Sequence, residues 1–204
     1  WLDPFPQTKE QVEEKIGKAR KQEILIAGML HKENLMELLR TFMVYDTKGS
    51  KRIKMIAKYQ QFRSVEKCIL HTEIGTNPLE KGGIIWHTPG AGKSLDMLWV
   101  AMRLKRKYGN PTVIVVTDRR QLDKQIHDTF VSCGFPSPTK AGDRDDLREM
   151  IEKNKGKTIM TTIQKFPFFK EDEEIHAVSD EPLFVLVDES HRTNFGITAG
   201  SMRK

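Results

Sequence analysis

The spacing of apolar positions differs between the two halves of the chain. Before about residue 75, apolar side chains recur every three or four positions, which predicts amphipathic helices over residues 8–30, 33–43 and 53–72. A polar break at residues 47–51, with the sequence Thr-Lys-Gly-Ser-Lys, interrupts this pattern and is a candidate boundary. The first part of the chain is therefore expected to be helical.

From Gly82 onward, short apolar runs alternate with longer amphipathic stretches. The runs predict buried strands at 83–86, 112–117, 158–161 and 183–187. The amphipathic stretches predict helices at 93–107, 119–133 and 143–154. Strands that alternate with helices predict an α/β fold, with a parallel sheet flanked by helices on both faces. In such a fold, ligands bind beyond the carboxyl ends of the strands.

Composition narrows the class of protein. Of the 204 residues, 30% are charged and 38% are hydrophobic, which is typical of a soluble globular chain. The net charge of +6 suits a nucleic-acid partner, although a solvated basic surface explains it equally well. The cysteines, Cys68 and Cys133, are too far apart to indicate a zinc site or a disulfide framework, and they fit a cytoplasmic location. No apolar run approaches the ~18 residues of a membrane span.

A glycine-rich loop between a predicted strand and a predicted helix indicates a phosphate site. Gly90 and Gly92 would let the backbone approach a phosphate, while the helix amino end points N–H groups at the anion. Lys93 can reach the β and γ phosphates, and the Ser94 hydroxyl can bind Mg²⁺. The strict P-loop pattern has glycine where this chain has His87. The expected nucleotide-binding residues are Thr88, Pro89, Gly90, Ala91, Gly92, Lys93 and Ser94.

Two consecutive acids follow the last predicted strand. Asp188 is suited to holding Mg²⁺, and Glu189 to orienting the attacking water, as a P-loop ATPase requires. Acids at this position could equally cap a following helix. The phosphate loop upstream in the same α/β pattern favours the catalytic interpretation.

These motifs resemble those of superfamily 2 helicases and translocases. Residues 188–191, Asp-Glu-Ser-His, resemble the DExH box, and residues 87–94 resemble the P-loop of type I restriction enzyme R subunits, in which His commonly replaces the first Gly. Residues 116–125 resemble motif Ia of that family, and residues 161–166 match its T-T-I-Q-K-F stretch. The resemblance extends from about residue 58 to the end of the chain.

The resemblance also suggests an adenine-binding residue. Residues 59–65 resemble the family's Q motif, in which a glutamine amide binds the adenine edge. Gln61 has the better spacing, Gln60 is second, and an exposed glutamine pair on a helix is the alternative.

By resemblance, the chain is the first RecA-like lobe of a motor that couples ATP hydrolysis to translocation on double-stranded DNA. Lys93, Asp188, Glu189 and His191 would be catalytic, with His191 linking the state of the γ-phosphate to later motifs. ATP and Mg²⁺ would be the cofactors, and the methylase and specificity subunits of a type I complex would be partners. The expected contacts to DNA phosphates are Thr117, Arg119, Arg120, Thr162 and Lys165. Arg119 and Arg120 could equally be solvated residues in the first turn of a helix, and Thr162 could equally be a helix cap.

The resemblance predicts a division into a helical connector, residues 1–50, and the first lobe, residues 51–204, incomplete at its C-terminus. We expect the nuclease core and the second lobe to lie outside this chain. Other superfamily 2 enzymes, such as a type III restriction subunit or a repair translocase, remain alternatives. A P-loop kinase or small-molecule ATPase is less compatible with the DExH box, and a degenerate scaffold is less compatible with the intact Lys93, Ser94, Asp188 and Glu189.

Overall fold

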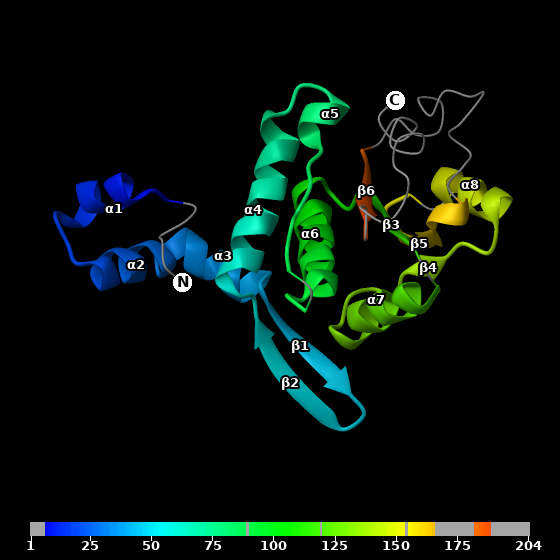
Figure 1. The fold of residues 1–204 in the computed structure, drawn as a ribbon, viewed down its shortest axis with the longest axis horizontal. Coiled ribbons are helices and arrows are strands. Elements are labelled where there is room, and N and C mark those ends of the chain that lie inside the picture. Colours follow the sequence, from blue (N-terminus) through cyan, green and yellow to red (C-terminus); the bar gives the residue numbers. More distant parts are fainter. Residues whose placement is uncertain (1–6, 89, 119, 154, 166–181, 189–204) are drawn as a thin grey trace. The chain divides into compact units, whose positions relative to one another are not determined.

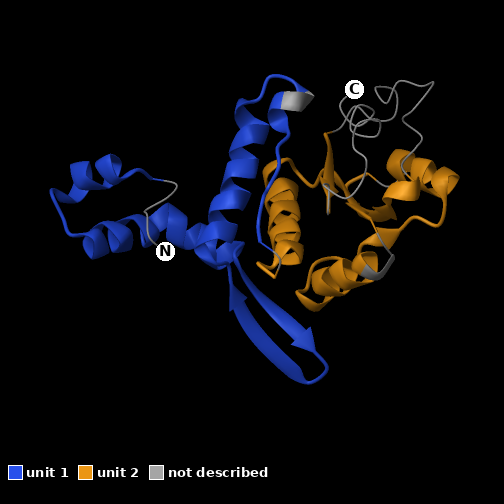
Figure 2. Cartoon of the chain, in the orientation of Figure 1, with its two compact units in different colours: residues 1–89 blue, residues 90–204 orange. Residues whose placement is uncertain are grey.

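The computed structural model describes residues 7–88, 90–118, 120–153, 155–165 and 182–188. The chain forms two compact units, Trp1–Pro89 and Gly90–Lys204, coloured separately in Figure 2. Among the described residues, no helix combines the length and apolar character needed to cross a lipid bilayer.

The second unit contains a parallel sheet of four strands (Figure 1). In spatial order the strands are β4 (Thr139–Lys140), β5 (Thr158–Thr162), β3 (Thr112–Thr117) and β6 (Leu183–Val187). The predicted strands at 112–117, 158–161 and 183–187 are thus confirmed, and β4 is a short edge strand that the apolar pattern did not reveal. The α/β class with a parallel sheet is confirmed.

Helices cover both faces of this sheet. α8 (Arg144–Lys153) packs Leu147 and Ile151 against Ile114 and Val116 of β3, all of them buried. α6 (Lys93–Lys107) and α7 (Arg120–Ser132) both pack on β3 and on each other. α7 connects β3 to β4 and α8 connects β4 back to β5, so these two crossovers run in opposite directions along the sheet. Crossovers between parallel strands are right-handed, which places α7 and α8 on opposite faces, and α6 packs beside α7. These three helices confirm the predicted ones to within a residue or two.

Lys105, near the end of α6, forms hydrogen bonds with the neighbouring loops. Its Nζ donates to Asn110 Oδ1 at 3.1 Å, to the Pro111 carbonyl at 3.2 Å and to the Gly156 carbonyl at 2.9 Å. Partial burial lowers the pKa of the Lys105 ammonium below its usual range. The contacts hold the start of β3 beside the turn that leads into β5.

The first unit is mainly helical, as predicted, but its helices are shorter. The stretch 8–30 forms α1 (Lys9–Ile16) and α2 (Lys21–Met29), separated at Gly17, whose φ of 78° ends α1. α3 (Lys32–Arg40) follows, then α4 (Tyr59–Ile74) and the short α5 (Pro78–Lys81). Phe42 and Phe62 meet edge to face, with ring centroids 4.7 Å apart, in the core of this unit.

The helix predicted from residue 53 was wrong at its start. Residues 53–56 are not helical but belong to β2 (Lys51–Ile56), which pairs antiparallel with β1 (Met43–Lys48). The polar break at 47–51 contains the turn of this hairpin, whereas the compact units divide after Pro89. Over so short a length, a segment rich in lysine and isoleucine fits both the helical and the strand periodicity of apolar residues. Its pairing with β1 makes it a strand. The functional division at residue 50 stays a prediction.

The strand expected at 83–86 is also absent from the described structure. Residues 82–88 have no regular secondary structure, and the side chains of Ile84 and Trp86 are 78% and 83% exposed. A run of apolar residues becomes a strand only when a neighbour supplies backbone partners, and none of the described strands pairs with this segment.

Candidate functional site

The amino end of α6 has the geometry of an anion site. Gly90 and Gly92 have φ values of 75° and 92°, which glycine adopts without steric cost. The Gly92 carbonyl accepts from the N–H groups of Leu95 at 2.9 Å and Asp96 at 3.2 Å. Lys93 and Ser94 therefore occupy the first two helical positions, where N–H groups lack carbonyl partners within the helix. Together with the helix dipole, this end attracts a negatively charged group.

The carboxyl ends of three strands meet at one edge of the sheet. Thr117 of β3 lies opposite Thr162 of β5, and Val116 lies opposite Val187 of β6. Asp188 follows immediately, and its N–H donates to the Val116 carbonyl at 2.9 Å, so the β6 ladder holds the start of this acidic segment. The starts of the three sequence motifs, at Thr117, Thr162 and Asp188, are thus brought together.

The direction of α6 brings the glycine loop to the same edge. Only residues 108–111 separate the end of α6 from the start of β3, and α6 packs on β3, so the two run antiparallel. The 15 residues of α6 span roughly 22 Å and the six of β3 roughly 20 Å, so the start of α6 lies near the end of β3. Gly90–Ser94 and Asp188 therefore belong to the same side of the second unit.

A buried carboxylate lies one turn into the same helix. The side chain of Asp96 is 3% exposed, and its backbone N–H binds Gly92. Asp96 was not predicted as a site residue, because a single acid after a P-loop lysine has no characteristic spacing. An acid in the first turn is favoured by the helix dipole, so Asp96 stabilises the turn on which Lys93 and Ser94 lie.

The predicted adenine-binding glutamines differ in their surroundings. Gln61 is 2% exposed, and its Oε1 accepts the Lys58 N–H at 2.9 Å at the start of α4. Gln60, in contrast, is exposed. The amide oxygen that would accept a hydrogen bond from adenine thus caps a helix in this conformation.

Among the predicted DNA-contacting residues, the two threonines are buried, whereas Lys165 makes a hydrogen bond to the backbone. Thr117 is fully buried, and its hydroxyl donates to the Thr161 carbonyl at 3.5 Å, while Thr162 is 9% exposed. Lys165 lies in the short 3₁₀ helix η1 (Ile163–Lys165) and donates to the Ala141 carbonyl. The structure thus places both threonines inside the sheet rather than on the surface, because each ends a strand buried on both faces.

The remaining predicted site residues are placed as follows. Thr88 is exposed and belongs to the first unit, and Arg120 begins α7. Pro89, Arg119, Glu189 and His191 lie outside the described residues. Gln164, which was not selected, donates from Nε2 to the Asp118 carbonyl at 3.2 Å and so links the ends of β5 and β3.

Comparison with known proteins agrees with this architecture. The family model described as SWI2/SNF2 ATPase matches residues 60–204. The HindI type I restriction enzyme endonuclease subunit of Haemophilus influenzae is 36% identical over 186 residues, which cover 85% of this chain and 17% of that subunit. The MjaIXP endonuclease subunit of Methanocaldococcus jannaschii is 37% identical over 190 residues, covering 89% of this chain and 18% of that subunit.

The chain therefore spans less than a fifth of the length of these relatives. Their names confirm the resemblance to type I restriction R subunits that the motifs indicated. Since the matched residues include the glycine loop, the parallel sheet and Asp188, this chain belongs to the SWI2/SNF2 ATPase family.

Proposed function

We propose that this chain is the ATP-binding lobe of the motor in a type I restriction enzyme R subunit, which uses ATP hydrolysis to move along double-stranded DNA. The observation that carries the proposal is the shared sheet edge, to which α6 brings Gly90–Ser94 and β6 brings Asp188. Family membership supports ATP as the nucleotide, and the names of the relatives support a restriction system.

The nucleotide would bind at the amino end of α6. Backbone N–H groups there and the Lys93 ammonium would hold the β and γ phosphates. The Ser94 hydroxyl and the Asp188 carboxylate are hard oxygen donors of the kind that Mg²⁺ prefers, so the residues fit this metal. Bound Mg²⁺ would neutralise charge on the phosphate oxygens. Glu189 would orient the attacking water, and His191 would link the nucleotide state to later motifs.

Basic side chains would make most of the contacts to DNA. The burial of Thr117 and Thr162 leaves their hydroxyls poorly suited to reach a phosphate. Arg119, Arg120 and Lys165 thus remain the proposed contacts near the strand ends, and they would bind the backbone without regard to sequence, as a motor requires. The methylase and specificity subunits would supply the choice of DNA site. Gln61, or Gln60 in its place, would bind the adenine.

The second lobe and the nuclease would lie in other parts of a longer protein, since the chain spans only 17–18% of its relatives. In motors of this kind the second lobe completes the hydrolysis site. We expect this chain alone to bind ATP weakly, to hydrolyse it slowly, and neither to translocate nor to cleave DNA. Strong stimulation of its ATPase activity by duplex DNA would contradict the need for a second lobe.

Replacement of Lys93 tests the nucleotide site. Lys93→Ala should weaken binding of a fluorescent ATP analogue by at least about tenfold, because a charged hydrogen bond contributes roughly 1.5–3 kcal/mol. Lys107→Ala, at the other end of the same helix, removes the same charge and should leave the affinity unchanged. Equal affinities in a titration with Mg²⁺ present would refute the P-loop assignment.

A further inference from the structure

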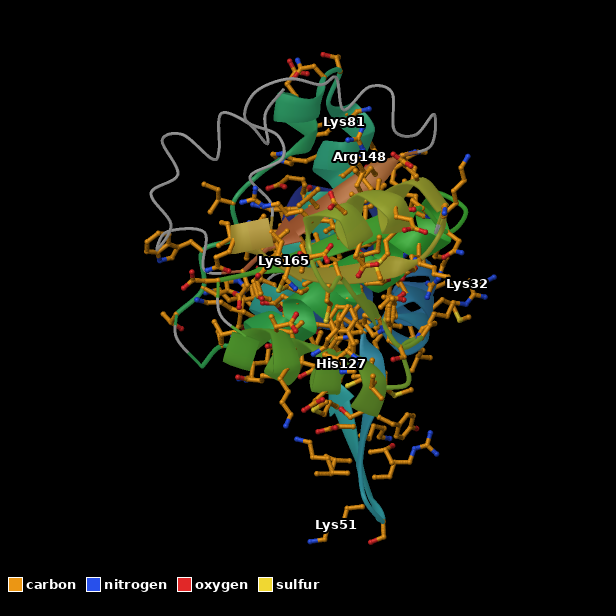
Figure 3. All side chains as sticks on the ribbon, turned by 90° about the vertical axis from the view of Figure 1, so that its right-hand side faces the viewer. Lys32, Lys51, Lys81, His127, Arg148 and Lys165 are labelled. Carbon is orange, nitrogen blue, oxygen red and sulfur yellow. The ribbon has the colours of Figure 1, made fainter. Side chains whose placement is uncertain are left out.

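The β1–β2 hairpin is an exposed basic element that the nucleotide site does not use. Its base is fixed in the first unit, where Val44 is 4% exposed and the Ala57 N–H donates to the Phe42 carbonyl at 2.9 Å. Beyond this base, β2 is exposed at every position except the half-buried Met55. Figure 1 shows the two strands extending from the start of α4, and Figure 3 labels Lys51 at their far end.

The register places cations on a defined face of the hairpin. Residues directly opposite each other in an antiparallel pair share a face. Tyr45 lies opposite Lys54, and Thr47 lies opposite Arg52, so these four side chains lie together; we call this surface the Arg52 face. Its members offer two positive charges and two hydroxyl groups. The structure describes every residue of the hairpin, and the Arg52 face carries no acidic side chain.

The opposite face differs in charge. It carries Asp46, whose carboxylate pairs with Lys48 at 3.2 Å, together with Lys51 and the 54% exposed Ile53. The single acid of the hairpin is thus kept away from Arg52 and Lys54. Positive charge is concentrated in this element, with four basic residues and one acidic residue, whereas the whole 204-residue chain has a net charge of only +6.

The side chains of the Arg52 face are suited to binding phosphate. The Arg52 guanidinium lies 4.2 Å from the centroid of the Tyr45 ring, which holds it over the sheet surface. Arg52 and Lys54 are two positions apart on one strand, so their bases are separated by about 7 Å. The guanidinium, the ammonium and the two hydroxyls of this face can all donate hydrogen bonds to phosphate oxygens.

We propose that the Arg52 face binds the phosphate backbone of duplex DNA, so that the hairpin is a sequence-independent DNA-contacting arm of the first unit. The inference deepens the proposed motor function and rests on it for the choice of double-stranded DNA. Charge complementarity and the row of donors favour DNA over an acidic protein surface, which would not require two hydroxyls beside the cations.

The test compares two double variants of the 204-residue chain that lose the same charge. Arg52→Gln with Lys54→Gln removes the cations of the Arg52 face. Lys32→Gln with Lys67→Gln removes two exposed cations from α3 and α4 of the same unit. Affinity for a fluorescent duplex of mixed sequence is measured by anisotropy at several salt concentrations, and circular dichroism verifies that both variants are folded.

We expect the hairpin variant to lose about tenfold in affinity at low salt, and the slope of log affinity against log salt to fall by about two, because each phosphate contact contributes nearly one. The control variant should lose less than about threefold. Equal losses in the two variants would overturn the proposal, as would a wild-type chain that does not bind duplex DNA.

Failure of the arm and failure of the motor proposal are distinguishable. If Lys93→Ala abolishes ATP binding while the hairpin variant binds DNA like its control, the motor proposal stands and the arm is rejected. If the hairpin variant alone loses DNA affinity while Lys93→Ala still binds ATP normally, the arm is retained and the nucleotide site is rejected.

Discussion

Strands β2 and β3 are each six residues long, yet they occupy opposite environments. β3 is buried at all six positions, whereas β2 is exposed at five and half-buried at the sixth. β3 pairs with both β5 and β6 and has helices on both faces, while β2 pairs with β1 alone. A strand enclosed on all sides is mostly apolar, as the central Val-Ile-Val-Val run of β3 illustrates, so it can be recognised in the sequence. A strand with one partner can be mostly polar, and it cannot then be recognised in this way.

The sharpest test of this comparison is the same substitution in each strand. Ile114→Ala in β3 should lower the free energy of unfolding by about 3 kcal/mol, because it removes buried methyl groups and leaves a cavity between β3 and α8. Ile53→Ala in β2 should cost less than about 0.5 kcal/mol, because the side chain is 54% exposed. Urea denaturation of both variants measures the difference.

The outcome depends on whether Ile53 remains exposed in solution. A loss at Ile53 as large as that at Ile114 would mean that the face of the hairpin opposite the Arg52 face packs against another surface. A small loss at Ile114 would contradict the packed core around β3.

A second prediction concerns how β3 is held in place. Lys105→Met removes three hydrogen bonds, to Asn110, Pro111 and Gly156, while keeping most of the aliphatic side chain. The partly buried carbonyls would lose their partner, and we expect a destabilisation of about 1–2 kcal/mol. Lys67→Met, at an exposed position of α4, is the matched control and should change stability by less than about 0.5 kcal/mol. Thermal unfolding of the two variants should separate them, and equal midpoints would show that the Lys105 contacts are not stabilising.

Much of the second unit could be predicted from the sequence, because its elements are enclosed, as β3 is and β2 is not. Its central strands are short apolar runs, and its helices have one apolar face, as Leu147 and Ile151 of α8 illustrate. The two-residue β4 could not be predicted, since its pairing with β5 depends on tertiary structure. The apolar run at 83–86 was predicted to be a strand but is not one, because an apolar pattern alone does not provide a pairing partner.

The backbone of the candidate site was predictable where its conformation depends on residue type. Gly90 and Gly92 have the positive φ values that the phosphate-loop interpretation required, and Asp188 follows a paired strand as expected. Side-chain environment was less predictable. The threonines at the ends of β3 and β5 look like exposed donors in the sequence, but they are buried because both strands are enclosed. The basic face of the hairpin was missed because the sequence pattern predicted a polar break at 47–51 and a helix from residue 53, not two paired strands.

The smallest predicted effect separates two neighbouring glutamines. Gln61→Ala should lower stability by about 1 kcal/mol, since the Lys58 N–H loses its acceptor and a buried side chain is truncated. Gln60→Ala removes an exposed side chain and should be nearly neutral. The same pair tests adenine recognition through the preference for ATP over GTP. If Gln60→Ala alone reduces that preference, Gln61 is a helix-capping residue and Gln60 contacts the base. If Gln61→Ala alone reduces it, Gln61 contacts the base, and its surroundings must rearrange when nucleotide binds because the side chain is buried in this conformation.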